Sequence, residues 1–432
     1  MAGPGQQAFG DAAWANHQED IHIFSLAAPI EASASVPVPR SRATSSGLPD
    51  DGTEPALVAS PSYMDAGIIV VGGGPVGSAL GLMIPGALVL EAATFPRDKP
   101  CGEGLMPTGA RLLREAGCDL GAEGFPLLRG VRYSIPHSGS ARAEFALGFG
   151  HGVRRTRLDA LLAERAGVRT GVRVTAVRSL PDRVEVDTSN GTLVGSALVA
   201  ADGIRSPVAR MLGWWRPSRG PARYGLVGHL AVERPGSDVE VTLLGDVETY
   251  LAPVGAEEVL VAVLGGKGVL RAQRLTTEQS YRAVLERSHP ELASAQLVGG
   301  LTGAGPFNLH PRSVAEGRIF LAGDAAGFLD PLTGDAMSAG IAQAGALAQF
   351  LSEGLERAAP RYRRWYAGQW RRRRLVTSLA RTLSSSSRLG QRAIRGAASH
   401  PEALQALLSV NDGSRTLRSV RARDWATLLG VG

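Results

Sequence analysis

The feature that most constrains the fold is a glycine run that directly follows a short apolar stretch. Residues 68–71 read Ile-Ile-Val-Val, and residues 72–77 read Gly-Gly-Gly-Pro-Val-Gly. The apolar stretch predicts a buried strand, and the glycines allow a tight turn into a helix whose first N–H groups can face a pyrophosphate. A second apolar run ends at Glu91, at about the twenty-residue distance where an acidic side chain binds ribose hydroxyls. Strand, glycines, second strand and acid, in that order, predict a dinucleotide-binding α/β unit.

Two further motifs lie far along the chain. Residues 201–206 read Ala-Asp-Gly-Ile-Arg-Ser, and residues 317–327 read Gly-Arg-Ile-Phe-Leu-Ala-Gly-Asp-Ala-Ala-Gly. With the glycine run, they resemble the flavoprotein superfamily that contains aromatic-ring hydroxylases of the p-hydroxybenzoate hydroxylase type and the geranylgeranyl reductases. The resemblance covers about residues 65 to 350. It implies FAD as cofactor, with Asp202 and Gly203 near its phosphates, and Gly323 and Asp324 at its ribitol and pyrophosphate.

Two other segments fit the same superfamily. Residues 95–105, here called the flavin loop, look like the segment that runs along the flavin ring, and residues 155–159 resemble the helix start where relatives place an arginine near FAD. For Cys101 we favour a packing role beside the ring over a redox role, because no second cysteine lies at CxxC spacing. For Arg155 a solvated charge at a helix start is the alternative. The residues expected at the cofactor are Gly72, Gly74, Pro75, Gly77, Glu91, Arg97, Cys101, Gly102, Arg155, Asp202, Gly203, Gly323, Asp324, Pro331, Gly334, Ala336 and Met337.

The patterns along the chain predict an α/β protein: a three-layer, Rossmann-like FAD-binding domain with an inserted, mostly antiparallel substrate sheet and a helical C-terminus. The expected divisions are a disordered, dispensable tail (1–63), the first part of the FAD-binding domain (64–221, with inserted strands near 129–150), the substrate sheet (222–308), the second part of the FAD-binding domain (309–355) and a C-terminal helical region (356–432).

Three departures from the superfamily pattern bear on cofactor affinity. The chain between Gly77 and Glu91 is short by about four residues, roughly one helical turn. Residues 164–171 also look short, as if a strand were missing. Ala336 stands where relatives usually have glycine, which predicts a methyl group near the flavin ring.

Composition narrows the range of partners. The net charge of +6 permits an anionic partner, but no aromatic-interleaved basic groove or nucleic-acid motif is present, so we expect no nucleic-acid binding. Residues 361–374 alternate aromatic side chains with arginines, which we interpret as the solvated face of a helix that packs across the FAD domain; a peripheral membrane or lipid contact is the alternative. Two cysteines and no long apolar run favour a cytoplasmic protein.

Three reactions remain open from the sequence. The resemblance favours an NAD(P)H-dependent monooxygenase that hydroxylates a phenolic or polyketide-type aromatic through a flavin C4a-hydroperoxide. An ene-reductase of an isoprenoid is the alternative, although the Tyr-x-Trp-x-Phe-Pro element of the reductases is absent here. A degenerate flavin-binding scaffold is the third. We expect His229 and Tyr250 as catalytic residues, with Arg223, Tyr224 and His310 nearby, and no metal site.

Overall fold

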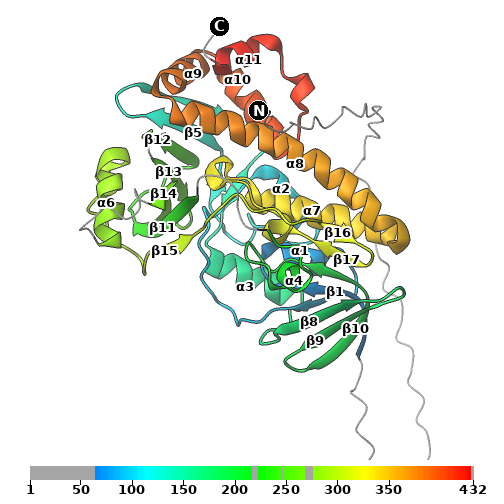
Figure 1. Ribbon diagram of the computed structural model, residues 1–432. Helices are drawn as coiled ribbons and strands as arrows, with labels where there is room; N and C mark the ends of the chain where they lie inside the picture. The colour runs from blue at the N-terminus through cyan, green and yellow to red at the C-terminus, as the bar shows by residue number, and fades with distance from the viewer. Residues whose placement is uncertain (1–63, 217–221, 246, 268–275, 430–432) are drawn as a thin grey trace, which may run out of the picture. The chain divides into compact units, whose positions relative to one another are not determined.

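The computed structural model describes residues 64–216, 222–245, 247–267 and 276–429 (Figure 1). The expected N-terminal tail, residues 1–63, lies outside the described residues.

A mixed sheet at the centre of the FAD-binding domain carries the cofactor motifs. Its main path runs β16-β17-β10-β1-β2, and a β8–β9 hairpin joins the edge of β10. The strands β1, β2, β10 and β17 are parallel, with Val70 of β1 opposite Val89 of β2 and Val199 of β10. The strands are β1 (Met64–Val71), β2 (Leu88–Leu90), β8 (Val174–Ser179), β9 (Val184–Thr188), β10 (Gly191–Ala200), β16 (Ala315–Glu316) and β17 (Ile319–Leu321).

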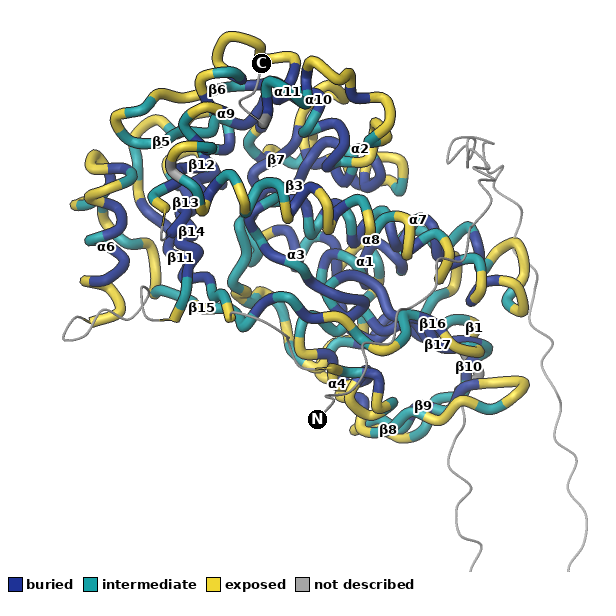
Figure 2. Tube along the Cα trace, turned by 45° about the horizontal axis from the view of Figure 1, so that its top comes forward, coloured by how far each residue is buried: buried dark blue, intermediate teal, exposed yellow. Residues whose placement is uncertain are grey.

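Apolar strands and helices bury this sheet. Ile69 and Val70 are fully buried, as the alternation-free apolar run of β1 predicts for a parallel strand covered on both faces. The β8–β9 hairpin, in contrast, is only partly buried: most of its residues are intermediate or exposed, although Val184 and Val186 lie in the core (Figure 2). The helices of this part are α1 (Pro75–Met83), α2 (Pro107–Glu115), α3 (Arg155–Arg165), α4 (Pro207–Met211) and α7 (Ala336–Ser352), and the short 3-10 turns are η2 (Gly323–Ala326) and η3 (Pro331–Thr333).

A second sheet forms the expected substrate domain, in the order β15-β11-β14-β13-β12-β5-β6. The inserted strands near 129–150 pair with it, because β5 runs parallel to β12. One face packs on α6, a helix within residues 222–308 that the strand pattern had not predicted. The elements are β5 (Gly130–Ile135), β6 (Gly139–Glu144), β11 (Arg223–Ala231), β12 (Asp238–Leu243), β13 (Val247–Pro253), β14 (Glu258–Gly266), β15 (Thr302–Ala304), α6 (Thr277–Ser288) and η1 (Pro290–Leu292).

The two remaining groups of elements complete the described chain. A small sheet of β3 (Gly104–Leu105), β7 (Gly150–Gly152) and β4 (Leu127–Leu128) carries the end of the flavin loop. The C-terminal region is helical as predicted, and Figure 1 shows its long helix α8 crossing the molecule beside α7. Its members are α8 (Leu355–Ser385), α9 (Ser387–Ser399), α10 (Pro401–Asp412), η4 (Leu417–Ser419) and α11 (Ala422–Leu429), of which α9 and α10 lie against β6.

The two segments expected to be short, Gly77 to Glu91 and residues 164–171, still connect the helices and strands on either side of them. Helix α1 has nine residues and leads directly into β2. Where a strand was expected to be missing, Arg169 makes a single parallel bridge to Leu90, supported by the hydrogen bond from the Glu91 N–H to the Arg169 carbonyl at 2.9 Å. The parallel order next to β2 is therefore kept by one bridge.

Candidate cofactor and substrate site

The glycine turn between β1 and α1 admits no side chain at its two key positions. Gly72 has φ +104°, and a Cβ there would lie 2.5 Å from the carbonyl oxygen of Ala201. A Cβ on Gly77 would lie 1.7 Å from the carbonyl oxygen of Gly72. Gly74 caps α1 and Pro75 is its first residue, a position where the missing N–H costs nothing. The turn is thus built as the sequence predicted.

Glu91 lies across this turn. Its Oε2 accepts the Gly73 N–H at 2.9 Å and contacts Nη2 of Arg97 at 3.2 Å, while its Oε1 accepts the Ala93 N–H at 2.9 Å. The carboxylate therefore holds the end of β2 to the glycine turn. The expected contact with a ribose stays a prediction.

Two arginines beside Gly74 give the turn the chemistry of an anion site. A Cβ on Gly74 would lie 3.6 Å from Nη2 of Arg97 and 4.0 Å from Nη2 of Arg155. Arg155 pairs with Asp159 through two 2.7 Å hydrogen bonds, whereas Nε and Nη1 of Arg97 are buried without a hydrogen-bond partner among the described residues. Buried donors of this kind need an acceptor. The arrangement fits the pyrophosphate of a dinucleotide.

The other two cofactor motifs also meet at the ends of parallel strands. Oδ2 of Asp202 accepts the Val208 N–H of α4 at 3.0 Å, and its Oδ1 is buried without a described partner. Gly203 has φ +88°, which favours glycine. Gly323 follows β17 with φ +61°, and a Cβ there would lie 3.0 Å from Val76 of α1. Burial raises the pKa of Asp324, against the opposing effect of Arg155, Arg373 and Lys99.

The flavin loop is fastened by a residue that the sequence analysis missed, Glu103. It is 1% exposed and has φ +54°, a left-handed conformation that is uncommon outside glycine. Its Oε1 accepts the Arg155 N–H at 2.8 Å and a bond from Arg154 at 3.3 Å, and its Oε2 lies 2.9 Å from Nε2 of His229. One carboxylate thereby joins the flavin loop, the start of α3 and strand β11. The only sequence signal was an acidic residue inside a glycine-rich loop.

Tyr250 lies against the same loop. A Cβ built on Gly102 would lie 3.2 Å from the Tyr250 ring, and one built on Gly334 would lie 2.9 Å from it. A Cβ on Gly104 would lie closer still to the Tyr250 hydroxyl. Three glycines therefore make room for one aromatic ring. The Tyr250 hydroxyl is buried without a described hydrogen-bond partner. Burial raises the pKa of this hydroxyl well above its ordinary value, so it remains a donor at neutral pH.

The other predicted residues divide between the loop and its supports. Cys101 accepts the Glu103 N–H at 3.4 Å, and burial raises the pKa of its thiol, as suits a packing role. Pro331 begins η3. Ala336 packs on the Leu264–Phe307–Phe328 cluster and Met337 on the main core. The three further candidates of the substrate sheet do not lie at the flavin loop. Arg223 pairs with Glu248 and Asp330, and Tyr224 packs in the α6-facing core. The ring centroid of His310 lies 6.4 Å from that of Trp370.

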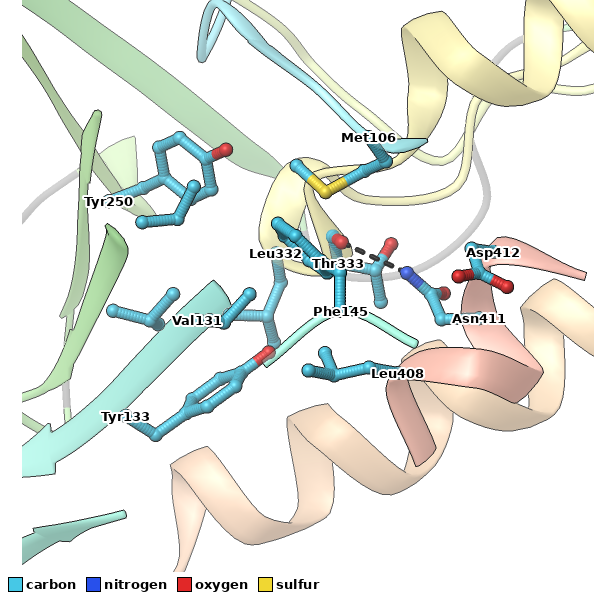
Figure 3. Close-up of a pocket in the computed structure, with 12 residues that line it drawn as sticks. Met106, Val131, Tyr133, Phe145, Tyr250, Leu332, Thr333, Leu408, Asn411 and Asp412 are labelled. Atoms are coloured by element: carbon cyan, nitrogen blue, oxygen red, sulfur yellow. Dashed lines mark hydrogen bonds between the residues drawn. The ribbon is translucent and has the colours of Figure 1, made fainter. Parts of the chain in front are cut away.

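A pocket opens between the second sheet, the η3 turn and helix α10, with Met106, the residue after the flavin loop, in its wall (Figure 3). The space between its walls is about 380 Å³ when volume open to solvent is included, and the part that the centre of a water molecule can occupy is about 20 Å³. Tyr250 stands at the end nearest the flavin loop, and we call this space the Tyr250 pocket. Its described lining is Met106, Val131, Tyr133, Phe145, Val239, Val241, Tyr250, Leu332, Thr333, Leu408, Asn411 and Asp412. The wall from α10 was not predicted, because the C-terminal helices carry no local signal of a binding role.

The arginine-rich stretch has a structural role in α8. Tyr362 donates to the Leu321 carbonyl at 2.8 Å, and Tyr366 donates to the Ala326 carbonyl at 2.6 Å. Arg373 is 8% exposed and pairs with Asp335, the residue before α7, at 3.1 Å. These bonds fasten α8 to the Gly-Asp motif, so the helix packs on the FAD domain as expected. The expectation of a solvated face is wrong for Tyr362, Tyr366 and Arg373, which are buried. In the described part of the chain, no helix has the length and apolar character to span a membrane, and no group of three or more potential metal ligands occurs.

Comparisons with known proteins agree with this geometry. A family model described as FAD binding domain matches residues 65–378. The menaquinone reductase of Mycobacterium tuberculosis H37Rv is 30% identical over 318 residues, which is 64% of this chain and 74% of that protein. The dialkyldecalin synthase of Streptomyces rugosporus is 32% identical over 300 residues, which is 64% of this chain and 63% of that protein.

Solved structures share the fold at lower identity. A flavoprotein/dehydrogenase from Cytophaga hutchinsonii matches with a TM-score of 0.70 and 20% identity, over 81% of this chain and 93% of that one. A halogenase solved in complex with phloroglucinol and FAD matches with a TM-score of 0.66 and 16% identity, over 84% and 86% of the two chains. Because the family model matches well over half of the chain, the chain belongs to the FAD binding domain family of FAD-dependent oxidoreductases.

Proposed function

We propose that the protein is an NAD(P)H-dependent monooxygenase that hydroxylates an aromatic substrate bound in the Tyr250 pocket. The observation that carries the proposal is the position of this pocket. It begins at Tyr250, whose ring packs on Gly102 and Gly334 at the expected flavin ring. A ligand there would lie next to the flavin and among mainly apolar side chains.

The described residues supply orientation and protection from water. Bound FAD supplies the redox chemistry, including the reaction with oxygen. Tyr250 is placed to donate a hydrogen bond to the substrate, because its hydroxyl is buried, protonated and without a described partner. Apolar side chains such as Val131 and Leu332 limit the access of water, which protects reactive oxygen species from decay.

His229 has a less direct role in this proposal. Its Nε2 bonds Glu103, and it is not among the described residues that line the pocket. This hydrogen bond occupies Nε2 of His229. We propose that this pair positions the flavin loop, and that a general-base role for His229 requires the substrate to reach Nδ1.

A reductase is the second candidate function. The menaquinone reductases at about a third identity favour it, since they are named for reduction of a quinone-bearing substrate. The glycine-lined contact of Tyr250 does not discriminate between the two reactions. A test must therefore determine whether the electrons of the reduced flavin pass to oxygen or to the substrate.

Labelled oxygen separates the two functions. Purified protein with FAD is mixed with NAD(P)H, ¹⁸O₂ and each member of a panel of phenols, and the products are analysed by mass spectrometry. The monooxygenase is expected to place one labelled atom in the product and to require oxygen. A reductase is expected to yield a reduced quinone or alkene product without oxygen. If neither NADH nor NADPH bleaches the absorbance of the flavin, the result would instead support the degenerate scaffold.

Tyr250→Phe provides the internal check on the site. We expect it to lower the ratio of hydroxylated product to NAD(P)H consumed, because the substrate loses one orienting bond. Tyr224→Phe, in the α6-facing core, is the matched control. A monooxygenase in which both variants keep the parental ratio would not use the Tyr250 hydroxyl.

A further inference from the structure

The polar groups of the Tyr250 pocket restrict the chemistry of its ligand. None of the twelve described lining residues is Lys, Arg or His, and the single ionisable carboxyl among them is that of Asp412. An anionic ligand would touch no cationic side chain among these lining residues and would lie near a carboxyl group, which is a costly position for a charge. The pocket therefore disfavours carboxylates and phosphates.

Two tyrosine hydroxyls offer hydrogen-bond donors. Figure 3 shows the hydroxyl of Tyr133 directed toward the middle of the pocket and that of Tyr250 directed toward the side of Met106; the two tyrosines come from two strands of the second sheet. Burial raises the pKa of Tyr133 to about 12, so both hydroxyls keep their protons at neutral pH. They suit a ligand with an acceptor such as a carbonyl oxygen.

An amide oxygen offers the opposite chemistry. Nδ2 of Asn411 donates to the Thr333 carbonyl at 3.1 Å, which fixes the orientation of the amide and leaves Oδ1 as its free end (Figure 3). Asn411 is 8% exposed, and this Oδ1 is buried without a described hydrogen-bond partner. A buried amide oxygen without a donor costs free energy that a ligand hydroxyl would recover.

We infer that the Tyr250 pocket selects an uncharged ring compound that carries both a carbonyl and a hydroxyl group, and that Asn411 of α10 recognises the hydroxyl. This inference rests on the proposed function, because it names the substrate class of the same pocket. It assigns a specificity role to the C-terminal helices. It also separates such substrates from compounds that carry a carboxylate or a phosphate group.

The test measures binding without turnover, so that it does not depend on the reaction. Oxidised holoenzyme, without NAD(P)H, is titrated by calorimetry with three bicyclic probes: 5-hydroxy-1-tetralone, 1-tetralone and 1-naphthoate. We expect the hydroxytetralone to bind about five-fold more tightly than 1-tetralone, the effect of about one net hydrogen bond. We expect 1-naphthoate to bind most weakly.

Variants locate the contacts. Asn411→Ala should abolish the preference for hydroxytetralone over 1-tetralone, whereas Glu402→Gln, on the exposed first turn of α10, should keep it. Tyr133→Phe or Tyr250→Phe should weaken 1-tetralone binding about five-fold. The two tyrosine variants keep the inference testable if Asn411→Ala does not fold.

Three results would overturn the inference: 1-naphthoate binding as tightly as hydroxytetralone, an equal loss for both tetralones in Asn411→Ala, or unchanged 1-tetralone binding in both tyrosine variants. The proposed function fails separately. If labelled oxygen never enters a product while the probe selectivity holds, the ligand class stands and the monooxygenase reaction does not. If an anionic phenol is hydroxylated, the reaction stands and the ligand class does not.

Discussion

Asp324 is the residue whose charge state most directly reports on the cofactor. Burial raises the pKa of its carboxyl, so the protein without FAD holds a proton there at a pH where an ordinary aspartate is ionised. A hydroxyl of the ribitol chain would donate to the carboxylate and stabilise the charged form. FAD binding then releases a proton, and affinity rises as the pH rises through the raised pKa and levels off above it.

The corresponding experiment is an FAD titration by flavin fluorescence from about pH 5 to about pH 8. Asp324→Asn should remove the pH dependence and weaken FAD about ten- to hundred-fold, as expected for a lost bond to a charged group. Asp202→Asn should weaken FAD less, because Asp202 already accepts the Val208 N–H. In the absence of FAD, the free energy of unfolding changes with pH in the opposite direction to FAD affinity. The folded state then binds more protons than the unfolded state, so stability falls as the pH rises through the same interval. If FAD affinity still depends on pH in Asp324→Asn, another group is responsible for that dependence.

At the level of single residues, local motifs were readable from the sequence and long-range partners were not. Gly72 and Gly77 are demanded by a turn of six residues, so their spacing alone predicted it. Glu103 contacts His229 across 126 positions of sequence, and Asn411 contacts Thr333 across 78. Such contacts depend on how whole elements pack, which no short pattern encodes. The methyl group of Ala336 packs on the Leu264–Phe307–Phe328 cluster, and its expected position near the flavin ring stays a prediction.

Among the elements, α8 shows how a charged stretch is divided between core and solvent. Arg373 is buried against Asp335, whereas the adjacent Arg374 is exposed. The aromatic and arginine pattern predicted a helix that packs on the FAD domain, and α8 does so. Which arginine of the run would be buried was not predictable, because it depends on the position of the residue before α7.

Arg373→Met tests this division of roles. Removal of the guanidinium leaves the buried Asp335 carboxylate without its partner, so we expect the free energy of unfolding to fall by about 3 kcal/mol. Arg374→Met should change it by less than about 0.5 kcal/mol. Urea unfolding followed by circular dichroism measures both. The double variant Arg373→Met, Asp335→Asn should recover part of the lost stability. If Arg373→Met and Arg374→Met change the free energy of unfolding equally, the Arg373–Asp335 pair contributes nothing.

For the whole molecule, three distant segments form one cofactor site because they end parallel strands of one sheet. The Gly72 turn follows β1, Asp202 follows β10 and Asp324 follows β17. In open α/β sheets ligands bind outside the carboxyl ends of such strands. This rule made the FAD-binding half of the fold predictable from three motifs. Helix α6 and the α10 wall escaped prediction, since amphipathic helices carry no mark of the surface that they will cover.

The complete site should distinguish FAD from FMN, because only FAD has the pyrophosphate and adenosine that Arg97 and Glu91 are expected to bind. A ligand that binds only the folded state stabilises it by about 2.7 kcal/mol at a hundred-fold excess over its Kd. We therefore expect FAD to raise the unfolding temperature by several degrees and FMN to raise it much less. Differential scanning fluorimetry with each flavin measures the difference.

Glu91→Gln decides whether Glu91 acts on the cofactor or only on the turn. If the carboxylate binds the adenosine ribose, this variant should reduce the stabilisation by FAD toward that by FMN and leave the FMN value unchanged. Glu115→Gln, at the exposed end of α2, should alter neither. The structure supplies the competing outcome, because Glu91 also accepts the Gly73 N–H and pairs with Arg97. A variant that loses FAD and FMN stabilisation equally would mean that Glu91 serves the glycine turn and does not discriminate FAD from FMN.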